Sequence, residues 1–149
     1  MTDVTIHPAR PRDLPVLQEM IRALSAHHGD AAPVTLSFLQ EHLFDSGRAC
    51  AFLARAGEAP LGHAACTRQI RLNSGQRFWD VQQLYVAPIW RGRGVGRALL
   101  DRVAKAARDE GAGWLTIGTA PDNAPAQAAY RALGWEEVTG AGPRFRRPL

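Results

Sequence analysis

A glycine-rich segment in the second half of the chain carries the most specific chemistry. It joins an apolar run ending at Val86 to an amphipathic pattern that begins at Val95. Glycines in such a turn let several backbone N–H groups converge on one point, and a following helix N-terminus adds the positive end of its dipole. Arginines around the same turn add full charges, so the pattern predicts a site for a pyrophosphate-like anion. The residues expected there are Arg91, Gly92, Arg93, Gly94, Val95, Gly96 and Arg97.

Two familiar phosphate motifs do not match this segment. A Walker loop requires Gly-Lys-Ser/Thr, which is absent. A dinucleotide fingerprint that starts at Gly92 would need a small residue where Arg97 stands, and one that starts at Gly94 would need it at Leu99. A plain turn with solvated arginines is the remaining alternative. The strand, the turn, the helix and the arginines in register favour anion binding over it.

The elements that must position this turn form a mixed α/β pattern. Apolar positions such as Leu14, Leu17, Ile21 and Leu24 recur at helical spacing after Pro11 and Asp13, and alternating or apolar runs indicate strands. The order predicts about four helices around a central mixed sheet of about six to seven strands. Strands are expected at 3–7, 49–55, 61–73, 77–86, 114–119, 135–138 and 144–147, and helices at 11–29, within 30–46, at 94–110 and at 124–133.

Size and composition indicate one ordinary globular domain over residues 1–149. Hydrophobic residues make up 46% and charged residues 21%, and no apolar run reaches the length of a membrane-spanning helix. The first residues lack the basic and apolar parts of a secretion signal. Cys50 and Cys66 lie in apolar runs and are expected to be buried reduced thiols. A cytoplasmic protein without membrane contact is therefore expected.

The charge distribution bears on partners. Lys and Arg number 18 against 14 acidic residues, a net charge of +4, and Lys105 is the only lysine. The arginines are spread along the chain, and Arg144, Arg146 and Arg147 form the only other cluster. A nucleic-acid-binding module would gather basic residues with stacking aromatics on one face, so nucleic acid is not the expected partner. The five histidines show no ligand spacing with thiols or carboxylates, so no metal is expected.

The glycine-rich segment resembles motif A of the GNAT superfamily of N-acetyltransferases. The family pattern Arg/Gln-x-x-Gly-x-Gly/Ala is met by Arg91, Gly94 and Gly96. A second family segment follows, with Asn123, Ala126 and Tyr130 matching Asn-x-x-Ala and the usual tyrosine. The family usually has Gly-Phe after this tyrosine, and here the pair is Gly134-Trp135, so Trp135 is a departure from the pattern. The order of elements is similar over nearly the whole chain.

The resemblance implies a GNAT-like fold that binds acetyl-coenzyme A between two splayed parallel strands, which end near Val86 and Thr119. The pyrophosphate would meet the turn. The pantetheine would pair with the strand backbone, and the N–H of Leu84 would polarise the thioester carbonyl. An amine would attack the bound thioester directly. The further cofactor-binding residues that it implies are Leu84, Tyr85, Val86, Asn123, Ala126 and Tyr130.

Catalytic groups can be named on the same basis. Tyr130 is the candidate general acid for the departing thiolate, and it lies two helical turns from Asn123, on the same side. Packing beneath the helix is its alternative role. Many relatives carry a glutamate at the position of Gln82, and glutamine is not a useful base. Asp80, His27 and His28 are the remaining candidates for the base.

The first half of the chain contains residues that could select the amine that accepts the acetyl group. Between Ser25 and Gly47 the charged residues are Asp30, Glu41 and Asp45, with no Lys or Arg. Such a lobe would attract a small cationic amine, although one solvated acidic helix is the plainer interpretation. The residues assigned to the acceptor are His27, His28, Glu41 and Gln82.

Several alternatives stay open. The acceptor can be a protein or peptide amine, which would need an open groove, and the donor can carry a longer acyl group. A third hypothesis is a module that binds acyl-coenzyme A without turnover. It is compatible with Gln82, which stands where many relatives carry a glutamate. Small members of such families are often dimers, so a homodimer is compatible with the sequence.

Overall fold

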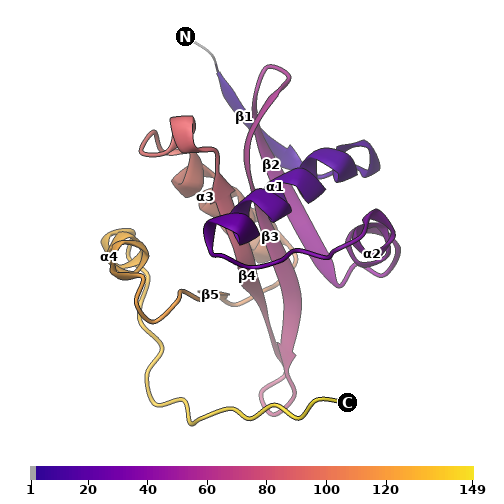
Figure 1. Cartoon of the computed structure of the whole chain (residues 1–149). Coiled ribbons are helices and arrows are strands. Elements are labelled where there is room, and N and C mark those ends of the chain that lie inside the picture. The colour runs from indigo at the N-terminus through magenta and orange to yellow at the C-terminus, as the bar shows by residue number, and fades with distance from the viewer. Residues whose placement is uncertain (1–2) are drawn as a thin grey trace. The chain divides into compact units, whose positions relative to one another are not determined.

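A computed structural model describes residues 3–149, in two compact units, one ending at Ile117 and one beginning at Gly118. The first unit is built on one sheet of five strands in the order β1-β2-β3-β4-β5 (Figure 1). Neighbouring strands are antiparallel except β4 and β5, which are parallel. The strands are β1 (Val4–Pro8), β2 (Ala49–Ala56), β3 (Ala59–Arg71), β4 (Gln76–Val86) and β5 (Leu115–Ile117).

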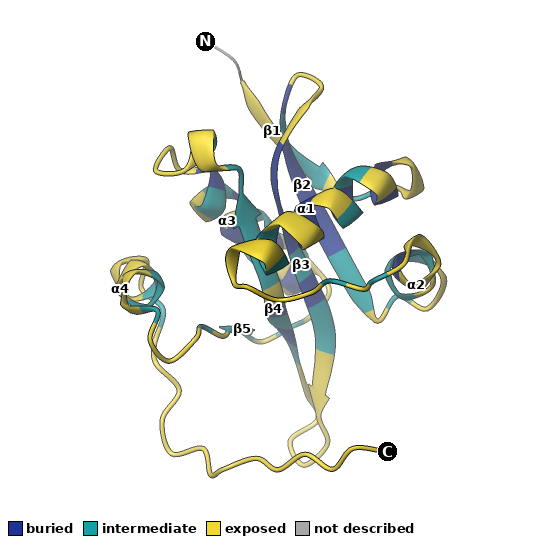
Figure 2. Cartoon of the chain, in the orientation of Figure 1, coloured by how far each residue is buried: buried dark blue, intermediate teal, exposed yellow. Residues whose placement is uncertain are grey.

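Helices cover both faces of this sheet. The helices α1 (Leu14–His27) and α2 (Leu36–Gln40) lie in front of the sheet in Figure 1, and α3 (Val95–Asp109) lies behind it. The burial colours of Figure 2 place the core along the middle strands between these layers. Short single turns complete the unit: η1 (Pro11–Asp13), η2 (Glu41–Asp45) and η3 (Pro88–Trp90). Leu17 of α1, Leu53 of β2 and Leu99 of α3 are among the most deeply buried side chains.

The second unit contains the helix α4 (Ala124–Ala132). The Asn123 side chain caps its first turn by accepting a hydrogen bond from the N–H of Ala126 at 3.3 Å. At the other end Gly134 adopts a left-handed conformation with φ 89°, as helix ends often require. The N–H of Trp135 then bonds back to the carbonyl of Tyr130.

The strands predicted at 135–138 and 144–147 are absent from the described residues. The sheet therefore has five strands where six to seven were predicted. Neither segment alternates apolar and polar residues: two glutamates separate Trp135 from Val138, and Phe145 stands among arginines. A strand also needs a backbone partner, and within the described residues neither segment has one. The other predicted elements are confirmed to within a few residues.

A bulge interrupts β4 at Gln82. Cys66 of β3 pairs with Val81 and Ala65 pairs with Gln83, so Gln82 is an extra residue on β4. The Gln82 side chain bonds to Thr67 at 3.4 Å, and Gln83 bonds to His63 at 3.0 Å. Thr67 and His63 point to one face of β3 because they are an even number of residues apart. Both glutamines therefore lie on that face, which is the face covered by α1.

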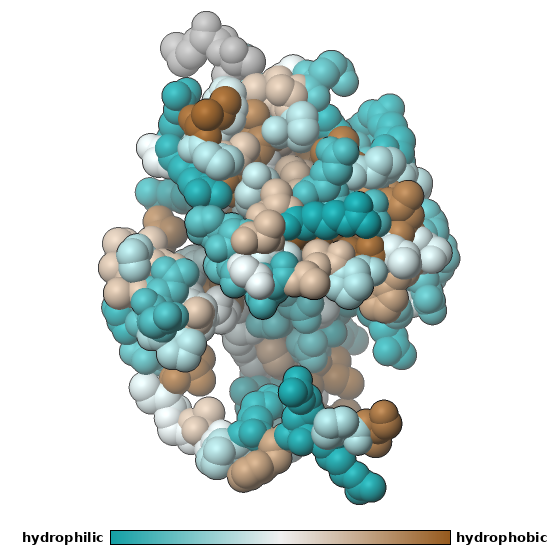
Figure 3. Space-filling view, in the orientation of Figure 1, coloured by the Kyte–Doolittle hydropathy of each residue, from teal (hydrophilic) through white to brown (hydrophobic). Residues whose placement is uncertain are grey.

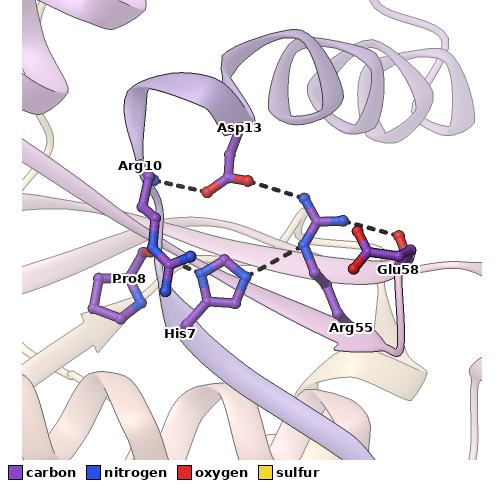
Figure 4. A network of polar contacts seen from close by, with 6 residues as sticks. All are labelled: His7, Pro8, Arg10, Asp13, Arg55 and Glu58. Carbon is purple, nitrogen blue, oxygen red and sulfur yellow. Dashed lines mark hydrogen bonds and ion pairs between the residues drawn. The ribbon is translucent and has the colours of Figure 1, made fainter.

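A buried ion pair fastens the start of α1 to β2 (Figure 4). Asp13 is only 3% exposed, and its carboxylate accepts hydrogen bonds from Arg55 at 2.9 Å and from the N–H of Arg10 at 2.8 Å. Burial would raise the pKa of Asp13, but these two bonds outweigh it and the pKa is lowered. Arg55 also donates to His7 and to the carbonyl of Glu58. The pair thus joins β1, η1 and the β2–β3 turn.

Candidate functional site

One edge of β4 is open over its last residues. The strand pairs with β5 only at Trp79, Asp80 and Val81, whereas it continues along β3 as far as Val86. From Gln82 to Val86 no described strand lies on the β5 side. A strand edge without a neighbour offers backbone N–H and C=O groups to a ligand. The family resemblance implies such a divergence of two parallel strands, although β5 ends at Ile117 and not near Thr119.

Leu84 and Val86 direct their backbone polar groups to this open edge. The N–H of Ala87 bonds to the carbonyl of Leu61 on β3, so the pair Gly62–Val86 is of the non-hydrogen-bonded kind. Alternation then turns the backbone of Leu84 outward as well, while that of Tyr85 faces β3. Of the three strand residues predicted to bind the cofactor, Leu84 and Val86 turn their backbone to the open edge and Tyr85 does not.

The glycine-rich turn leads from η3 into α3 with its first-turn amides free. Gly92 and Gly94 have φ values of 73° and 84°, in the left-handed region that suits glycine. Gly94 caps α3 without any side-chain hydrogen bond. The N–H groups of Val95, Gly96 and Arg97 have no acceptor within the described residues. The turn therefore ends in a helix N-terminus that can bind an anion.

Two of the arginines are held by local contacts. Arg91 donates from Nε to the carbonyl of Val86 at 2.9 Å, and the guanidinium of Arg93 lies 5.2 Å from the ring centroid of Trp90. A carbonyl has two lone pairs, so Val86 can still accept a second hydrogen bond. Arg97 is exposed in the first turn of α3.

Acetyl-coenzyme A fits this region. The free amides and arginines suit its diphosphate, and the open β4 edge suits the amides of its pantetheine. Gly96 lies where α3 approaches β4, and a Cβ there would already contact Val86 at 3.7 Å and Leu84 at 3.9 Å. These are ordinary van der Waals distances, so the start of α3 packs directly against the side chains of Leu84 and Val86.

The α1 face of β4 carries a row of polar side chains beside the open edge. Asp80 accepts a hydrogen bond from Thr116 at 2.7 Å, which ties β4 to β5. Gln82, at the bulge, is exposed. Asp80 shares this face with both glutamines, since it is two residues before Gln82. The two predicted residues of this row, Asp80 and Gln82, are thus brought together.

His63 was not among the residues predicted from the sequence. It is 0% exposed, it lies on β3 next to Tyr85, and its Nε2 is bonded to Gln83 at 3.0 Å. Its Nδ1 has no hydrogen-bond partner. Burial lowers the pKa of His63 to about 4, although the bond to Gln83 acts in the opposite direction. The only sequence signal is a histidine inside an apolar strand.

The lobe formed by α1, α2 and η2 is more open. His27 and His28 are exposed at the end of α1, with ring centroids 5.4 Å apart. Phe38 is 54% exposed and its ring centroid lies 4.3 Å from that of His42. Glu41 is exposed, with its carboxylate 3.9 Å from His42. Hydrophobic side chains reach the surface around α2 in Figure 3.

In the second unit, α4 presents the other predicted residues on one side. Asn123, Ala126 and Tyr130 are half-buried, at helical spacings of three and four, which agrees with the predicted common side. The oxygen of Asn123 is used to cap its own helix. Burial raises the pKa of Tyr130, and its ring centroid lies 5.9 Å from that of Trp135.

The rest of the described chain shows no second site with the predicted functional residues. A hollow of about 390 Å³ lies near the far end of the β3–β4 hairpin, lined by Arg68, Trp79 and Glu110 among others, and it contains no predicted site residue. Residues 3–149 hold no cluster of three or more His, Cys, Asp or Glu that could bind a metal ion. None of their helices has the length and apolarity needed to cross a bilayer.

Comparison of the sequence with known proteins identifies one family. The profile of the acetyltransferase (GNAT) family matches residues 16–135. An aminoglycoside N(6')-acetyltransferase type 1 of Stenotrophomonas maltophilia is 46% identical over 65 residues, which is 44% of this chain and 42% of that protein. An IAA acetyltransferase of Azospirillum brasilense is 29% identical over 150 residues, covering 100% of this chain and 95% of the relative.

Solved structures agree on the fold. The aminoglycoside acetyltransferase AAC(6')-Iy, solved with a bisubstrate analogue of coenzyme A and acetylneamine, superposes with a TM-score of 0.84 at 20% identity. The match covers 99% of this chain and 100% of that one. The chain belongs to the GNAT family of acetyltransferases, and the fold expected from the sequence is confirmed.

Proposed function

We propose that residues 1–149 act as one acetyltransferase domain that moves the acetyl group of acetyl-coenzyme A to a primary amine. The open edge of β4 beside the glycine-opened start of α3 carries this proposal. It combines unpaired strand amides, free helix amides and arginine charge within one continuous stretch, Leu84 to Arg97. Acetyl-coenzyme A supplies an activated thioester when bound.

The chain's own groups then act on that thioester. The N–H of Leu84 points to the open edge and polarises the acetyl carbonyl, which stabilises negative charge as the amine attacks. A carbon–nitrogen bond forms and the carbon–sulfur bond breaks. The amine loses a proton, and the departing thiolate gains one from the general acid.

Tyr130 is the proposed general acid. A phenol is protonated at neutral pH, and burial raises the pKa of Tyr130 above the ordinary value of 10.0, so the hydroxyl carries the proton that the thiolate needs. Asp80 is the proposed base, acting through water, since one of its carboxylate oxygens already accepts from Thr116. Gln82 is proposed to contact the acceptor from the bulge. Asn123 and Ala126 support α4, with Asn123 as the cap.

A small cationic amine is the acceptor that we favour. The lobe between Ser25 and Gly47 carries acidic side chains and no Lys or Arg. The exposed Phe38 ring offers a face for a cation, beside Glu41 and the histidines of this lobe. Similarity to an aminoglycoside acetyltransferase, which acts on polycationic amines, is in keeping with this choice.

The direct test is thiol release from acetyl-coenzyme A with a panel of amines: polyamines, aminoglycosides, free amino acids and short peptides. Turnover on polycationic small amines is expected. Glu41→Gln and Asp45→Asn should then raise KM for the amine, while Glu137→Gln, an exposed acidic position in the second unit, serves as the matched control.

Other results would change the proposal. Turnover confined to peptides would replace the small amine with a protein amine. Absence of turnover across the panel, with acetyl-coenzyme A still bound in calorimetry, would indicate a domain that binds without catalysis. Absence of binding would overturn the site itself.

A further inference from the structure

We propose that Cys50 and Cys66 form a redox-active thiol pair, in which a hydroperoxide oxidises Cys50 and Cys66 closes a disulfide between β2 and β3. This proposal is independent of the transferase activity. The two residues lie directly opposite each other on neighbouring antiparallel strands. Both are free thiols.

The register permits a bridge. The N–H of Arg68 bonds to the carbonyl of Arg48, and two positions further along the ladder Cys50 faces Cys66. By alternation this is a hydrogen-bonded pair, for which Cα atoms lie about 5.5 Å apart. Disulfides span Cα separations of roughly 4.4 to 6.8 Å. Opposite side chains of such a pair point to the same face. Because a disulfide needs Cβ atoms about 3.5 to 4.5 Å apart, the two strands must draw together slightly at this pair when the bridge forms.

The two thiols differ in access and in acidity. Cys66 is 1% exposed, whereas Cys50 is only half-buried near the start of β2. A hydrogen bond between the two thiols lowers the pKa of Cys50 against the effect of burial, and the charge of Arg68 lowers it further. The same hydrogen bond and burial raise the pKa of Cys66. Cys50 is therefore the more acidic and the more accessible of the two thiols.

Arg68 is held firmly beside this pair. Its guanidinium donates to the carbonyls of Gly47 and Ala49 at 2.7 and 3.2 Å and forms two hydrogen bonds with Glu110. It also lies 5.0 Å from the ring centroid of Trp79. A fixed positive charge, a half-exposed thiol and a second thiol directly opposite on the next strand are features of redox-sensitive cysteines.

The chemistry takes two steps. The Cys50 thiolate attacks the hydroperoxide, whose O–O bond breaks, to give a sulfenic acid and an alkoxide or hydroxide that takes up a proton. The Cys66 sulfur then attacks the Cys50 sulfur, and the hydroxyl leaves as water with the Cys66 proton. Two electrons pass from the thiols to the peroxide, and a dithiol restores both thiols.

Treatment of the full chain with equimolar hydrogen peroxide tests this. Both thiols should disappear from a thiol assay, the protein should lose two hydrogens in mass and remain monomeric on a non-reducing gel, and dithiothreitol should reverse the change. Trypsin cuts after Arg48, Arg55 and Arg68, so the two cysteines fall in peptides 49–55 and 56–68. These two peptides should be found joined in the oxidised wild type, which requires no variant to fold.

Variants assign the roles. Cys66→Ser should stop at a sulfenic acid on Cys50 that reacts with dimedone, and Cys50→Ser should react with peroxide many-fold more slowly. Arg68→Gln should slow the oxidation several-fold, while Arg77→Gln, on the neighbouring strand, serves as its control. Two titratable thiols after peroxide, a disulfide between chains, or faster oxidation of Cys66 than of Cys50 would each overturn the proposal.

Discussion

His63 is an ionisable side chain placed where no water reaches it. Its Nε2 bonds to Gln83 while Nδ1 has no partner, so a proton added to Nδ1 would place an uncompensated charge in the interior. The imidazole is therefore neutral in the folded protein at neutral pH. This cost falls on the folded state alone, because the histidine of the unfolded chain is solvated.

Stability should consequently fall as the pH is lowered. The pKa of His63 is about 4 in the folded chain against 6.5 for the ordinary side chain, so between these values the unfolded state binds more protons. From about pH 7 to about pH 5 the free energy of unfolding should drop by about 2 kcal/mol through this residue. Urea unfolding at the two pH values measures it.

The control for that experiment is His63→Gln, which keeps a donor for Gln83 and removes the titration. Its unfolding free energy should change less over the same range. Asp13 has a lowered pKa, so its contribution is lost only as the pH falls below the ordinary carboxyl pKa of 3.8, outside the window. Equal slopes for wild type and variant would contradict the assignment.

Tyr130 gives a second prediction for a single residue. Tyr130→Phe removes the acidic proton and keeps the ring, so kcat should fall by roughly 10²-fold with the Kd for acetyl-coenzyme A unchanged. Trp135→Phe alters the neighbouring aromatic packing without touching the hydroxyl and should leave kcat near the wild-type value. An unchanged kcat in Tyr130→Phe would leave Tyr130 with a packing role only.

Among the elements, the start of α3 depends on a left-handed residue. Gly94 has φ 84°, and Gly57 in the β2–β3 turn has φ 59°, each with open space where a Cβ would lie. Gly94→Ala and Gly57→Ala should therefore each lose about 1 kcal/mol of stability from the same backbone strain. Only Gly94→Ala should weaken acetyl-coenzyme A binding, measured by calorimetry. Equal affinities would show that the turn does not hold the cofactor.

Sequence periodicity located the elements but not their special residues. The helix α3 lies within a residue of its expected start because Val95, Leu99 and Val103 mark its buried stripe. The bulge at Gln82 has no comparable signal, since one extra residue in a strand leaves the apolar pattern almost intact. The role of His63 follows from its pairing with β4, which periodicity does not specify.

Across the whole molecule, an excess of arginine raises the question of whether acetyl-coenzyme A is attracted by net charge or by local charge. Arg97→Gln and Arg22→Gln, at an exposed position of α1 on the other face of the sheet, remove the same charge from a chain of net charge +4. At about 0.15 M salt the screening length is about 8 Å, so only charges near the anion contribute strongly. Arg97→Gln should weaken binding several-fold and reduce its salt dependence, and Arg22→Gln should not. Equal effects would indicate a general field.

Strand pairing is the property of the whole sheet that the sequence could not supply. The predicted site at Leu84 and Val86 depended on β4 and β5 separating, and the structure has them paired at three positions only. Conversely, the two segments at 135–138 and 144–147 were predicted as strands, and within the described residues neither has a partner in the sheet. Local pattern predicts which segments can be strands, and long-range pairing decides which of them are.

The bulge at Gln82 makes the course of β4 depend on a single residue. Val81 and Leu84 point toward α3 with two glutamines between them, so deletion of Gln82 would restore strict alternation without turning any neighbour over. The local bend that a bulge produces should then be lost, while the same side chains keep facing α3. The direction of the open β4 edge therefore depends on one inserted residue.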